Sequence, residues 1–166
     1  NTKAIITGSA SGLGEATARH FAAQGAHVTL LDRDADNGET IAHEIGGYFI
    51  PTDVTDEASV QDAIDGASER MGGLNTVINC AGIARAIKTV GRDGPHPLGA
   101  FKQTLDINLV GSFNVARLAA EMMGKNTPTA DGNRGVIINT SSIAAFDGQK
   151  GQTAYAASKG GIVGIT

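Results

Sequence analysis

The chain has 166 residues, close to the usual size of one domain, so we expect a single hydrophobic core. Hydrophobic residues make up 41% of it and charged residues 18%, a balance typical of globular proteins and unlike that of disordered ones. The net charge is −4 and the sequence has no basic run, so electrostatics give no support to nucleic-acid binding.

Cysteine, histidine and apolar runs limit where the protein works and what it binds. Cys80 is the only cysteine and cannot form an internal disulfide, which indicates a reducing compartment: the cytoplasm, or the mitochondrial matrix in a eukaryote. No apolar run approaches the roughly 20 residues that span a bilayer, so we expect no membrane partner. The four histidines are scattered without metal-ligand spacing, and we expect no metal site.

Both ends of the sequence look cut. Asn1 is not an initiator methionine, and Thr166 follows an apolar, helix-like stretch, 161–165, that has no terminating signal. We therefore expect residues to be missing at both ends, mostly after Thr166.

Five short runs rich in β-branched residues predict strands. They are near-continuous rather than alternating, which is typical of strands covered on both faces. The runs are Ala4–Thr7, His27–Asp32, Tyr48–Pro51, Thr76–Asn79 and Val136–Thr140. Amphipathic helices are predicted between them. Two apolar sets repeat at helical spacing: Val60, Ala63, Ile64, Ala67 and Met71, and Leu105, Leu109, Phe113, Ala116 and Ala120.

Strands that alternate with helices predict a parallel sheet with right-handed crossovers. We therefore expect an open, doubly wound, Rossmann-like α/β fold with strand order 3-2-1-4-5. Residues 1–166 would form a single domain. Turn residues over 91–95 and 124–128 predict the clearest loops.

The first predicted strand runs directly into a glycine-rich turn and a helix, Thr7–Gly14. A dinucleotide pyrophosphate needs backbone N–H donors at close range, and glycines allow a sharp turn in front of the positive helix N-terminus. The spacing is Gly-x-x-x-Gly-x-Gly, and a glycine-rich turn also occurs without a ligand, so its context decides. The predicted cofactor contacts in this turn are Gly8, Ser11, Gly12, Leu13 and Gly14.

An acidic residue ends the second predicted strand. Asp32 lies 18 residues after Gly14, where a carboxylate can bind the adenosine ribose hydroxyls and would repel the 2′-phosphate of NADP. Arg33 follows directly and could bind that phosphate. We expect NAD in preference to NADP, and the alternative for Asp32 is a solubilising charge at a strand end.

The next two strand ends extend the predicted cofactor site. Small residues at the carboxyl end of a strand let a ligand lie against the backbone. The predicted contacts are Asp53 and Val54 after the third strand, and Cys80, Ala81 and Gly82 after the fourth. We interpret Asn79 as a tie between neighbouring backbone segments, and Cys80 as a buried small apolar residue rather than a reactive thiol.

Tyr155 and Lys159 stand four residues apart and would share one face of a helix. A phenol ordinarily has a pKa near 10, too high for a base at neutral pH. A nearby ammonium and a positively charged oxidised nicotinamide would favour the phenolate. The pair is a candidate for acid/base chemistry, although this spacing also occurs by chance.

Taken together and in order, these motifs resemble the short-chain dehydrogenase/reductase family over essentially the whole chain. They are Thr7–Gly14, Asp32, Asn79–Gly82, Asn108, Ser142 and Tyr155-x-x-x-Lys159. Four stretches are most similar to the type II 3-hydroxyacyl-CoA dehydrogenases, the 17β-hydroxysteroid dehydrogenase type 10-like branch: Asn79–Ala84, Gly135–Thr140, Ala144–Gln149 and Ala157–Gly164.

The resemblance implies roles for individual residues. Tyr155 would be the general acid/base, and Ser142 would hydrogen-bond the substrate oxygen. Lys159 would bind the nicotinamide ribose and favour the phenolate. Asn108, at a kink over 108–111 in a long helix, would hold a water that links Lys159 to solvent. Without the family, Asn108 is simply a polar residue in an amphipathic helix.

The resemblance also implies an activity and an assembly. The protein would be an NAD-dependent enzyme of fatty acid metabolism that interconverts 3-hydroxyacyl-CoA and 3-oxoacyl-CoA. Gln149 would contact the acyl portion of the substrate, and Ser141 would have a structural role. Homotetramers would form through helices 105–120 and 155–166. The usual family chain adds two strands and a substrate-covering loop after the position of Thr166. Residues 1–166 would then be a single dinucleotide-binding and catalytic domain that is incomplete at its C-terminus, and a fragment ending there would fold weakly and not turn over.

Two other readings stay open. One is a 3-oxoacyl-carrier-protein reductase-like or hydroxysteroid-type enzyme, and Asp32 argues against the reductases that use NADPH. The other is a non-catalytic NAD-binding sensor. Such a sensor would be expected to lack Ser142, Tyr155 or Lys159, and all three are present.

Overall fold

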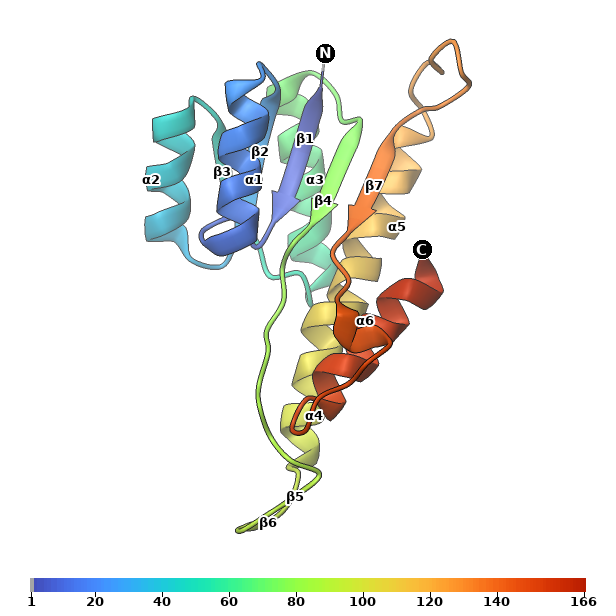
Figure 1. Ribbon diagram of the computed structural model, residues 1–166. Coiled ribbons are helices and arrows are strands. Elements are labelled where there is room, and N and C mark those ends of the chain that lie inside the picture. Colours follow the sequence, from blue (N-terminus) through green and yellow to red (C-terminus); the bar gives the residue numbers. More distant parts are fainter. Residues whose placement is uncertain (1) are drawn as a thin grey trace.

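The computed structural model describes residues 2–166, and a five-stranded parallel sheet forms its centre (Figure 1). The strands are β1 (Lys3–Thr7), β2 (His27–Asp32), β3 (Tyr48–Pro51), β4 (Thr76–Asn79) and β7 (Val136–Asn139). The first begins one residue earlier, and the last ends one residue earlier, than predicted. The order β3-β2-β1-β4-β7 confirms the predicted order and fold class.

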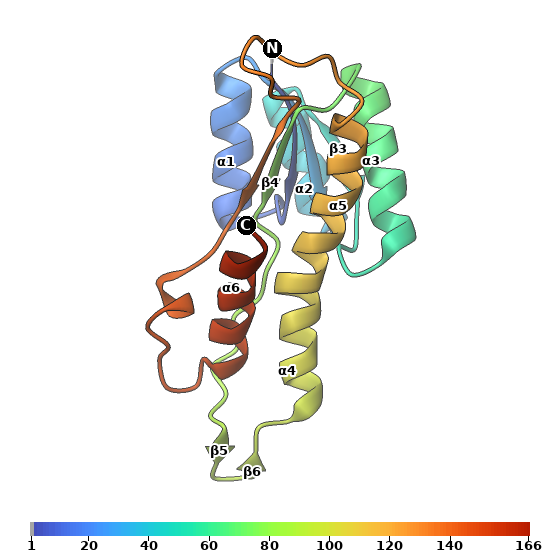
Figure 2. The ribbon, with the colours of Figure 1, turned by 90° about the vertical axis from the view of Figure 1, so that its right-hand side faces the viewer.

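Helices cover both faces of the sheet (Figures 1 and 2). On one face lie α1 (Gly12–Ala23) and α2 (Ala35–Ile45), and on the other α3 (Glu57–Met71) and α5 (Ser112–Met123). Each face has its own apolar core, which explains why the strands are apolar on both sides. The predicted α3 stripe is confirmed, because all five residues are buried: Val60, Ala63, Ile64, Ala67 and Met71. Within residues 2–166, no helix has the length and apolar character needed to cross a membrane.

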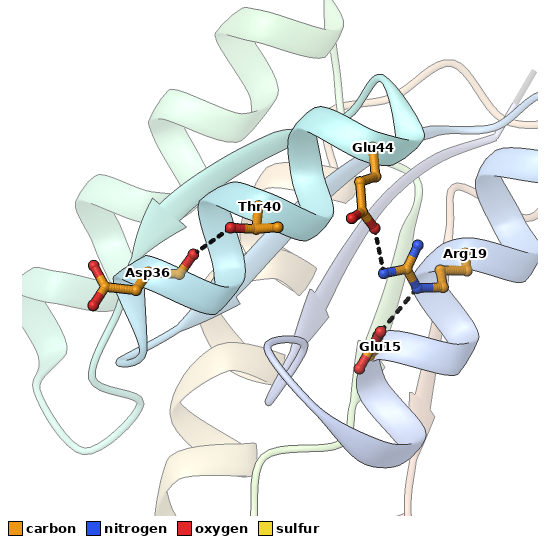
Figure 3. Close-up of polar contacts among 5 residues, drawn as sticks. All are labelled: Glu15, Arg19, Asp36, Thr40 and Glu44. Carbon is orange, nitrogen blue, oxygen red and sulfur yellow. Dashed lines mark hydrogen bonds and ion pairs between the residues drawn. The ribbon is translucent and has the colours of Figure 1, made fainter.

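Polar contacts on the outer surface join α1 to α2 (Figure 3). The Arg19 guanidinium in α1 pairs with Glu15 at 2.9 Å (Nε–Oε1) and with Glu44 of α2 at 2.6 Å (Nη2–Oε2). Within α2, the Thr40 hydroxyl donates to the carbonyl oxygen of Asp36. Each side chain of the two ion pairs is at least 33% exposed, so water screens these charges. The apolar contacts beneath them hold the two helices to the sheet.

A long helix covers one face of the sheet with its second half, and its first half extends beyond the carboxyl ends of the strands, where it lies beside the last helix (Figures 1 and 2). The long helix consists of α4 (Leu98–Leu105), a π-helical segment (Asp106–Gly111) and α5. The last helix, α6 (Thr153–Ile165), packs against α4 and the π-helical segment. Residues 108–111, where a kink is expected, lie in this π-helical segment, and π-helical turns commonly bend the helices that contain them.

The predicted apolar face of the long helix is partly wrong. Phe113 is 53% exposed, and Ala120 is exposed as well. Leu109 lies against Gly161 of α6 rather than in the core of the sheet. The buried positions of the long helix are Thr104, Asn108, Gly111, Ser112, Asn114, Val115, Leu118, Ala119 and Met123. The π-helical turn breaks the 3.6-residue spacing, and hydrogen bonds allow polar side chains to be buried, so a search for regularly spaced apolar residues misses this face.

An arm, residues 83–97, leaves β4, runs away from the sheet and returns to α4 (Figure 1). At its tip two short strands pair antiparallel: β5 (Val90–Gly91) and β6 (Gly94–Pro95). The predicted loop over 91–95 is therefore the turn of a small hairpin. The backbone N–H of Ile87 donates to the carbonyl of Gly151 at 2.9 Å, which ties the arm to the segment that precedes α6.

The turn between β1 and α1 requires glycine at two points. Gly8 has a φ of +65° and Gly12 a φ of +56°, a region that other L-residues rarely adopt. A Cβ on Gly8 would lie 2.7 Å from the backbone nitrogen and Cα of Ala81, whereas a Cβ on Gly12 would meet nothing within 4 Å. Gly8 therefore lets the turn touch the segment that follows β4, and Gly12 leaves space beside the start of α1.

We expect Gly8→Ala to lower the free energy of unfolding more than Gly12→Ala does. Both variants place an alanine in left-handed backbone, at a cost of about 1–2 kcal/mol. Only Gly8→Ala adds a collision with backbone, which can be relieved only by moving a strand end. Urea denaturation followed by circular dichroism measures both values, and equal losses would show that the approach to Ala81 is not tight.

Candidate active site

A cavity of about 460 Å³ opens at the carboxyl ends of β1, β2 and β4. It lies where the strand order reverses around β1, the place at which open α/β sheets bind ligands. Every residue predicted to contact the cofactor lines this cavity: Gly8, Ser11, Gly12, Leu13, Gly14, Asp32, Asp53, Val54, Cys80, Ala81, Gly82, Tyr155 and Lys159. Residues from the first turn and from α6, far apart in sequence, are thereby brought together.

A second cavity, of about 650 Å³, lies at the opposite edge of the sheet. Its lining includes Gly72–Thr76 and residues 133–136, at the amino ends of β4 and β7. None of the predicted site residues is among those that line it. The cavity at the carboxyl ends of the strands is therefore the candidate site.

Buried hydrogen bonds hold the strand ends beneath the candidate site. The Thr7 hydroxyl accepts from the backbone N–H groups of residues 80 and 81, at 3.2 and 3.1 Å. It donates to Oδ1 of Asn79 at 3.4 Å. Nδ2 of Asn79 donates to Oδ1 of Asn139 at 3.0 Å and to the carbonyl of Ser112 at 3.3 Å. The interpretation of Asn79 as a structural tie is confirmed.

The glycine turn is fixed against the end of β2. Oδ2 of Asp32 accepts from the backbone N–H of Ala10 at 2.9 Å, and its Oδ1 accepts from that of Asp34 at 3.1 Å. Ser11 is the N-cap of α1, yet its side chain makes no capping hydrogen bond. The first N–H groups of a helix have no partner within the helix, so the start of α1 can donate to an anion in the cavity.

The third strand end contributes an ordered carboxylate. Oδ1 of Asp53 accepts from the Thr55 hydroxyl at 2.7 Å and from the Thr55 backbone N–H at 3.0 Å. Oδ2 of Asp53 lies 3.7 Å from Nε of Arg33. The two Thr55 hydrogen bonds, helped by the nearby guanidinium, lower the pKa of Asp53, while partial burial opposes them. Asp53 is therefore held as an anion at the edge of the cavity.

Tyr155 and Lys159 face the cavity from α6. Nζ of Lys159 lies 5.7 Å from the centre of the Tyr155 ring and donates to the carbonyl of Thr140 at 2.6 Å. Lys159 is only 6% exposed, and this burial lowers its pKa, while Cys80 partly opposes the effect. Cys80 is half-buried rather than buried, and it packs beside the core formed with α1 and α2.

The cavity lining does not include Ser142 or Gln149. Ser142 lies between β7 and a 3-10 helix (Ile143–Ala145), and its hydroxyl accepts from the backbone N–H of Ala144 at 3.2 Å. Gln149 is exposed on the segment before α6. The Ser141 hydroxyl donates to the carbonyl of Lys159 at 3.1 Å, as its expected structural role requires.

Asn108 is completely buried within the π-helical segment. Its Oδ1 accepts from the backbone N–H of Ile83 at 2.8 Å, and its Nδ2 donates to the Ile83 carbonyl at 2.9 Å. The same Nδ2 lies 3.1 Å from the Ser158 hydroxyl oxygen. The side chain therefore joins the arm, the long helix and α6, and the water expected there stays a prediction.

Several cavity-lining residues escaped the sequence prediction. Thr52 and Thr140 directly follow β3 and β7, so the rule that ligands lie at the carboxyl ends of strands could have identified both. Ile107 could not have been found in this way, because the π-helical segment brings it to the cavity.

Comparisons with known proteins agree with this arrangement. Residues 2–166 match the family described as short chain dehydrogenase. The chain is 52% identical to 3-hydroxyacyl-CoA dehydrogenase type-2 of Rattus norvegicus, over 98% of this chain and 64% of that protein. It is 49% identical to the protein of the same name from Drosophila melanogaster, over 100% and 67%.

A crystal structure of 3-hydroxyacyl-CoA dehydrogenase type-2 from Mycobacterium avium matches this fold with a TM-score of 0.94 at 43% identity. The match covers 99% of this chain and 66% of that one. The chain thus spans between 64% and 67% of the length of these three relatives. These matches confirm the predicted resemblance: the chain belongs to the short-chain dehydrogenase family.

Proposed function

We propose that the protein is an NAD-dependent oxidoreductase that interconverts a secondary alcohol and a ketone. The observation that carries the proposal is the cavity at the carboxyl ends of the strands. It gathers a glycine turn, the carboxylate of Asp32 and the Tyr155–Lys159 pair in one place. An anion-binding turn beside an acid/base pair is the arrangement that hydride transfer with a dinucleotide needs.

The residues present fit a dinucleotide. Gly12 leaves open space at the start of α1, and the uncapped N–H groups there suit a pyrophosphate. Asp32 offers carboxylate oxygens to ribose hydroxyls, and its negative charge disfavours the 2′-phosphate of NADP. Val54 and the backbone of residues 80–82 would flank the adenine and the rest of the cofactor. NAD is therefore the proposed cofactor.

Tyr155 is the proposed general acid/base. Its hydroxyl would take the proton of the substrate alcohol during oxidation and return it during reduction. The Lys159 ammonium, 5.7 Å from the phenol ring, would favour the phenolate form and bind the nicotinamide ribose. When bound, the nicotinamide supplies the acceptor or donor of the hydride. The carbonyl of Thr140 orients Lys159 for this task.

The family resemblance supports roles for Ser142, Asn108 and Gln149 as well. Ser142 would hydrogen-bond the substrate oxygen and stabilise the charge that develops on it. Asn108 would hold a water that links Lys159 to solvent, and Gln149 would contact the acyl portion of the substrate. The hydrogen bonds of Asn108 to Ile83 fix the position of the arm beside α6 and support a role in shaping the site.

The proposed substrate pair is 3-hydroxyacyl-CoA and 3-oxoacyl-CoA, because the relatives at 49% and 52% identity carry that name. A carrier-protein-linked 3-oxoacyl group or a hydroxysteroid is the alternative substrate. We propose a homotetramer in the cytoplasm, or in the mitochondrial matrix of a eukaryote. Exposed apolar residues on the helices expected between subunits support this assembly: Val110, Phe113, Val163 and Ile165.

We expect Tyr155→Phe to abolish turnover without abolishing cofactor binding. The variant removes only the hydroxyl, so acid/base catalysis is lost, a factor of about 100 or more. NADH consumption with acetoacetyl-CoA measures turnover, and NADH fluorescence measures binding. Tyr48→Phe is the matched control, because Tyr48 lies on β3, outside the cavity lining. This variant should leave turnover unchanged.

Other results would redirect the proposal. Unimpaired turnover in Tyr155→Phe would remove Tyr155 from the mechanism. NADH binding without turnover of acetoacetyl-CoA, by a form of the protein as long as its relatives, would favour another alcohol or the NAD-binding sensor. The same result with residues 1–166 alone would indicate that the substrate-covering loop is needed for turnover.

The buried Lys159 also predicts a pH dependence of stability. Because burial lowers its pKa below that of the unfolded chain, the folded state binds this proton more weakly. The stability penalty is full below the folded pKa and disappears as pH rises from there towards 10.5. In that pH window, the free energy of unfolding of the unaltered protein should rise relative to that of Lys159→Met. The rise should be at most about 1.4 kcal/mol per pH unit.

Urea denaturation between pH 7 and 10.5, on the unaltered protein and Lys159→Met, measures this difference. The reference variant is Lys125→Met, which removes a lysine whose side chain is 75% exposed. It shows the effect of losing a lysine that is not buried. A constant difference between the unaltered protein and Lys159→Met would contradict the burial-lowered pKa.

A further inference from the structure

Arg33 and Asp53 form an ion pair across two neighbouring strand ends at the adenosine end of the cavity. Arg33 directly follows β2 and Asp53 follows β3, and the two strands pair so that Asp32 is opposite Pro51. Nε of Arg33 lies 3.7 Å from Oδ2 of Asp53, and both residues line the cavity. Among the residues that the structure describes, the lining contains one other cation, Lys159 on α6.

We propose that Asp53 sets the preference for NAD over NADP by holding the Arg33 guanidinium away from the 2′-phosphate. The proposal rests on the proposed function, because it assigns a specificity-determining role within that cofactor site. Arg33 is the residue that could otherwise favour NADP, since a guanidinium binds phosphate with two parallel hydrogen bonds.

The geometry of Asp53 suits this role. Both Thr55 hydrogen bonds fall on Oδ1, which leaves Oδ2 directed at Arg33. The carboxylate is therefore already ordered, and pairing with Arg33 does not require that its side chain lose further rotamer freedom. The Arg33 side chain is 72% exposed in the pair. It therefore has room to turn towards a ligand when an uncharged side chain replaces the Asp53 carboxylate.

Asp32 does not compete for the guanidinium in this arrangement. Its two oxygens accept from the backbone N–H groups of Ala10 and Asp34. With Arg33 paired to Asp53, the charged groups Asp32, Arg33 and Asp53 sum to one negative charge. A phosphate monoester adds about 1.5 to 2 further negative charges at neutral pH, so it meets repulsion and no free cation.

A second explanation for NAD preference is the negative field of the turn as a whole. Asp34 and Asp36 lie beside the cavity-lining residues at the start of α2, and Asp36 makes no ion pair with Arg33. The Asp36 carbonyl, not its carboxylate, accepts from Thr40 (Figure 3). Asp36→Asn therefore removes one negative charge nearby without touching the Arg33–Asp53 pair, and it is the matched control.

The test is a calorimetric titration of the protein with NAD+ and with NADP+. The quantity compared is the ratio of the two dissociation constants, because a lost adenine contact weakens both ligands alike and leaves the ratio unchanged. We expect Asp53→Asn to shift this ratio towards NADP+ by about two- to fivefold, the range that an exposed ion pair permits. Adding Arg33→Ala to Asp53→Asn should abolish the gain, and Asp36→Asn should not reproduce it.

Three results would overturn the inference. The ratio could stay unchanged in Asp53→Asn, the gain could survive in the double variant, or Asp36→Asn could give the same gain. The second and third results would assign the preference for NAD to the negative field of the whole turn rather than to the Arg33–Asp53 pair. Failure of the unaltered protein to bind either dinucleotide would instead contradict the proposed function itself, and the inference with it. Thermal melting of each variant confirms that the proteins compared are folded.

Discussion

The buried amide of Asn79 holds together the strand ends on which the candidate site depends. It accepts from Thr7 at the end of β1 and donates to Asn139 at the end of β7 and to the Ser112 carbonyl in α5. A buried polar group without such partners would cost roughly 1–3 kcal/mol, so the network fixes one arrangement of these ends. Three parts of the candidate site directly follow these strand ends: the glycine turn, the segment after β4, and Thr140, whose carbonyl accepts from Lys159.

Local patterns in the sequence were sufficient for most of the fold. Strands covered on both faces have near-continuous apolar runs, and these runs placed the five strands of the sheet to within one residue. The chirality of parallel crossovers then left few possible strand orders, and the carboxyl-end rule located the candidate cavity. The Tyr155–Lys159 spacing needed only helix geometry to place both residues on the cavity side of α6.

Features that depend on contacts between distant segments could not be predicted in the same way. The interior face of the long helix was missed because Asn108 and Ser112 are polar and a π-helical turn shifts the spacing. The pairing of Arg33 with Asp53 needed the register of β2 and β3. Ser142 and Gln149, named from the family resemblance, lie on segments outside the cavity lining, where no local pattern fixes a side chain against the ligand.

Amide hydrogen exchange with and without NADH tests most directly whether the cavity at the carboxyl ends of the strands is the dinucleotide site. Bound NADH should slow exchange at Gly8, at Ser11–Gly14, at residues 80–82 and at the start of α6, where the cavity lining lies. Exchange should stay unchanged over Gly72–Thr76 and residues 133–136, which line the cavity at the opposite edge. Slower exchange at the opposite edge, with none at the glycine turn, would contradict the placement of the site.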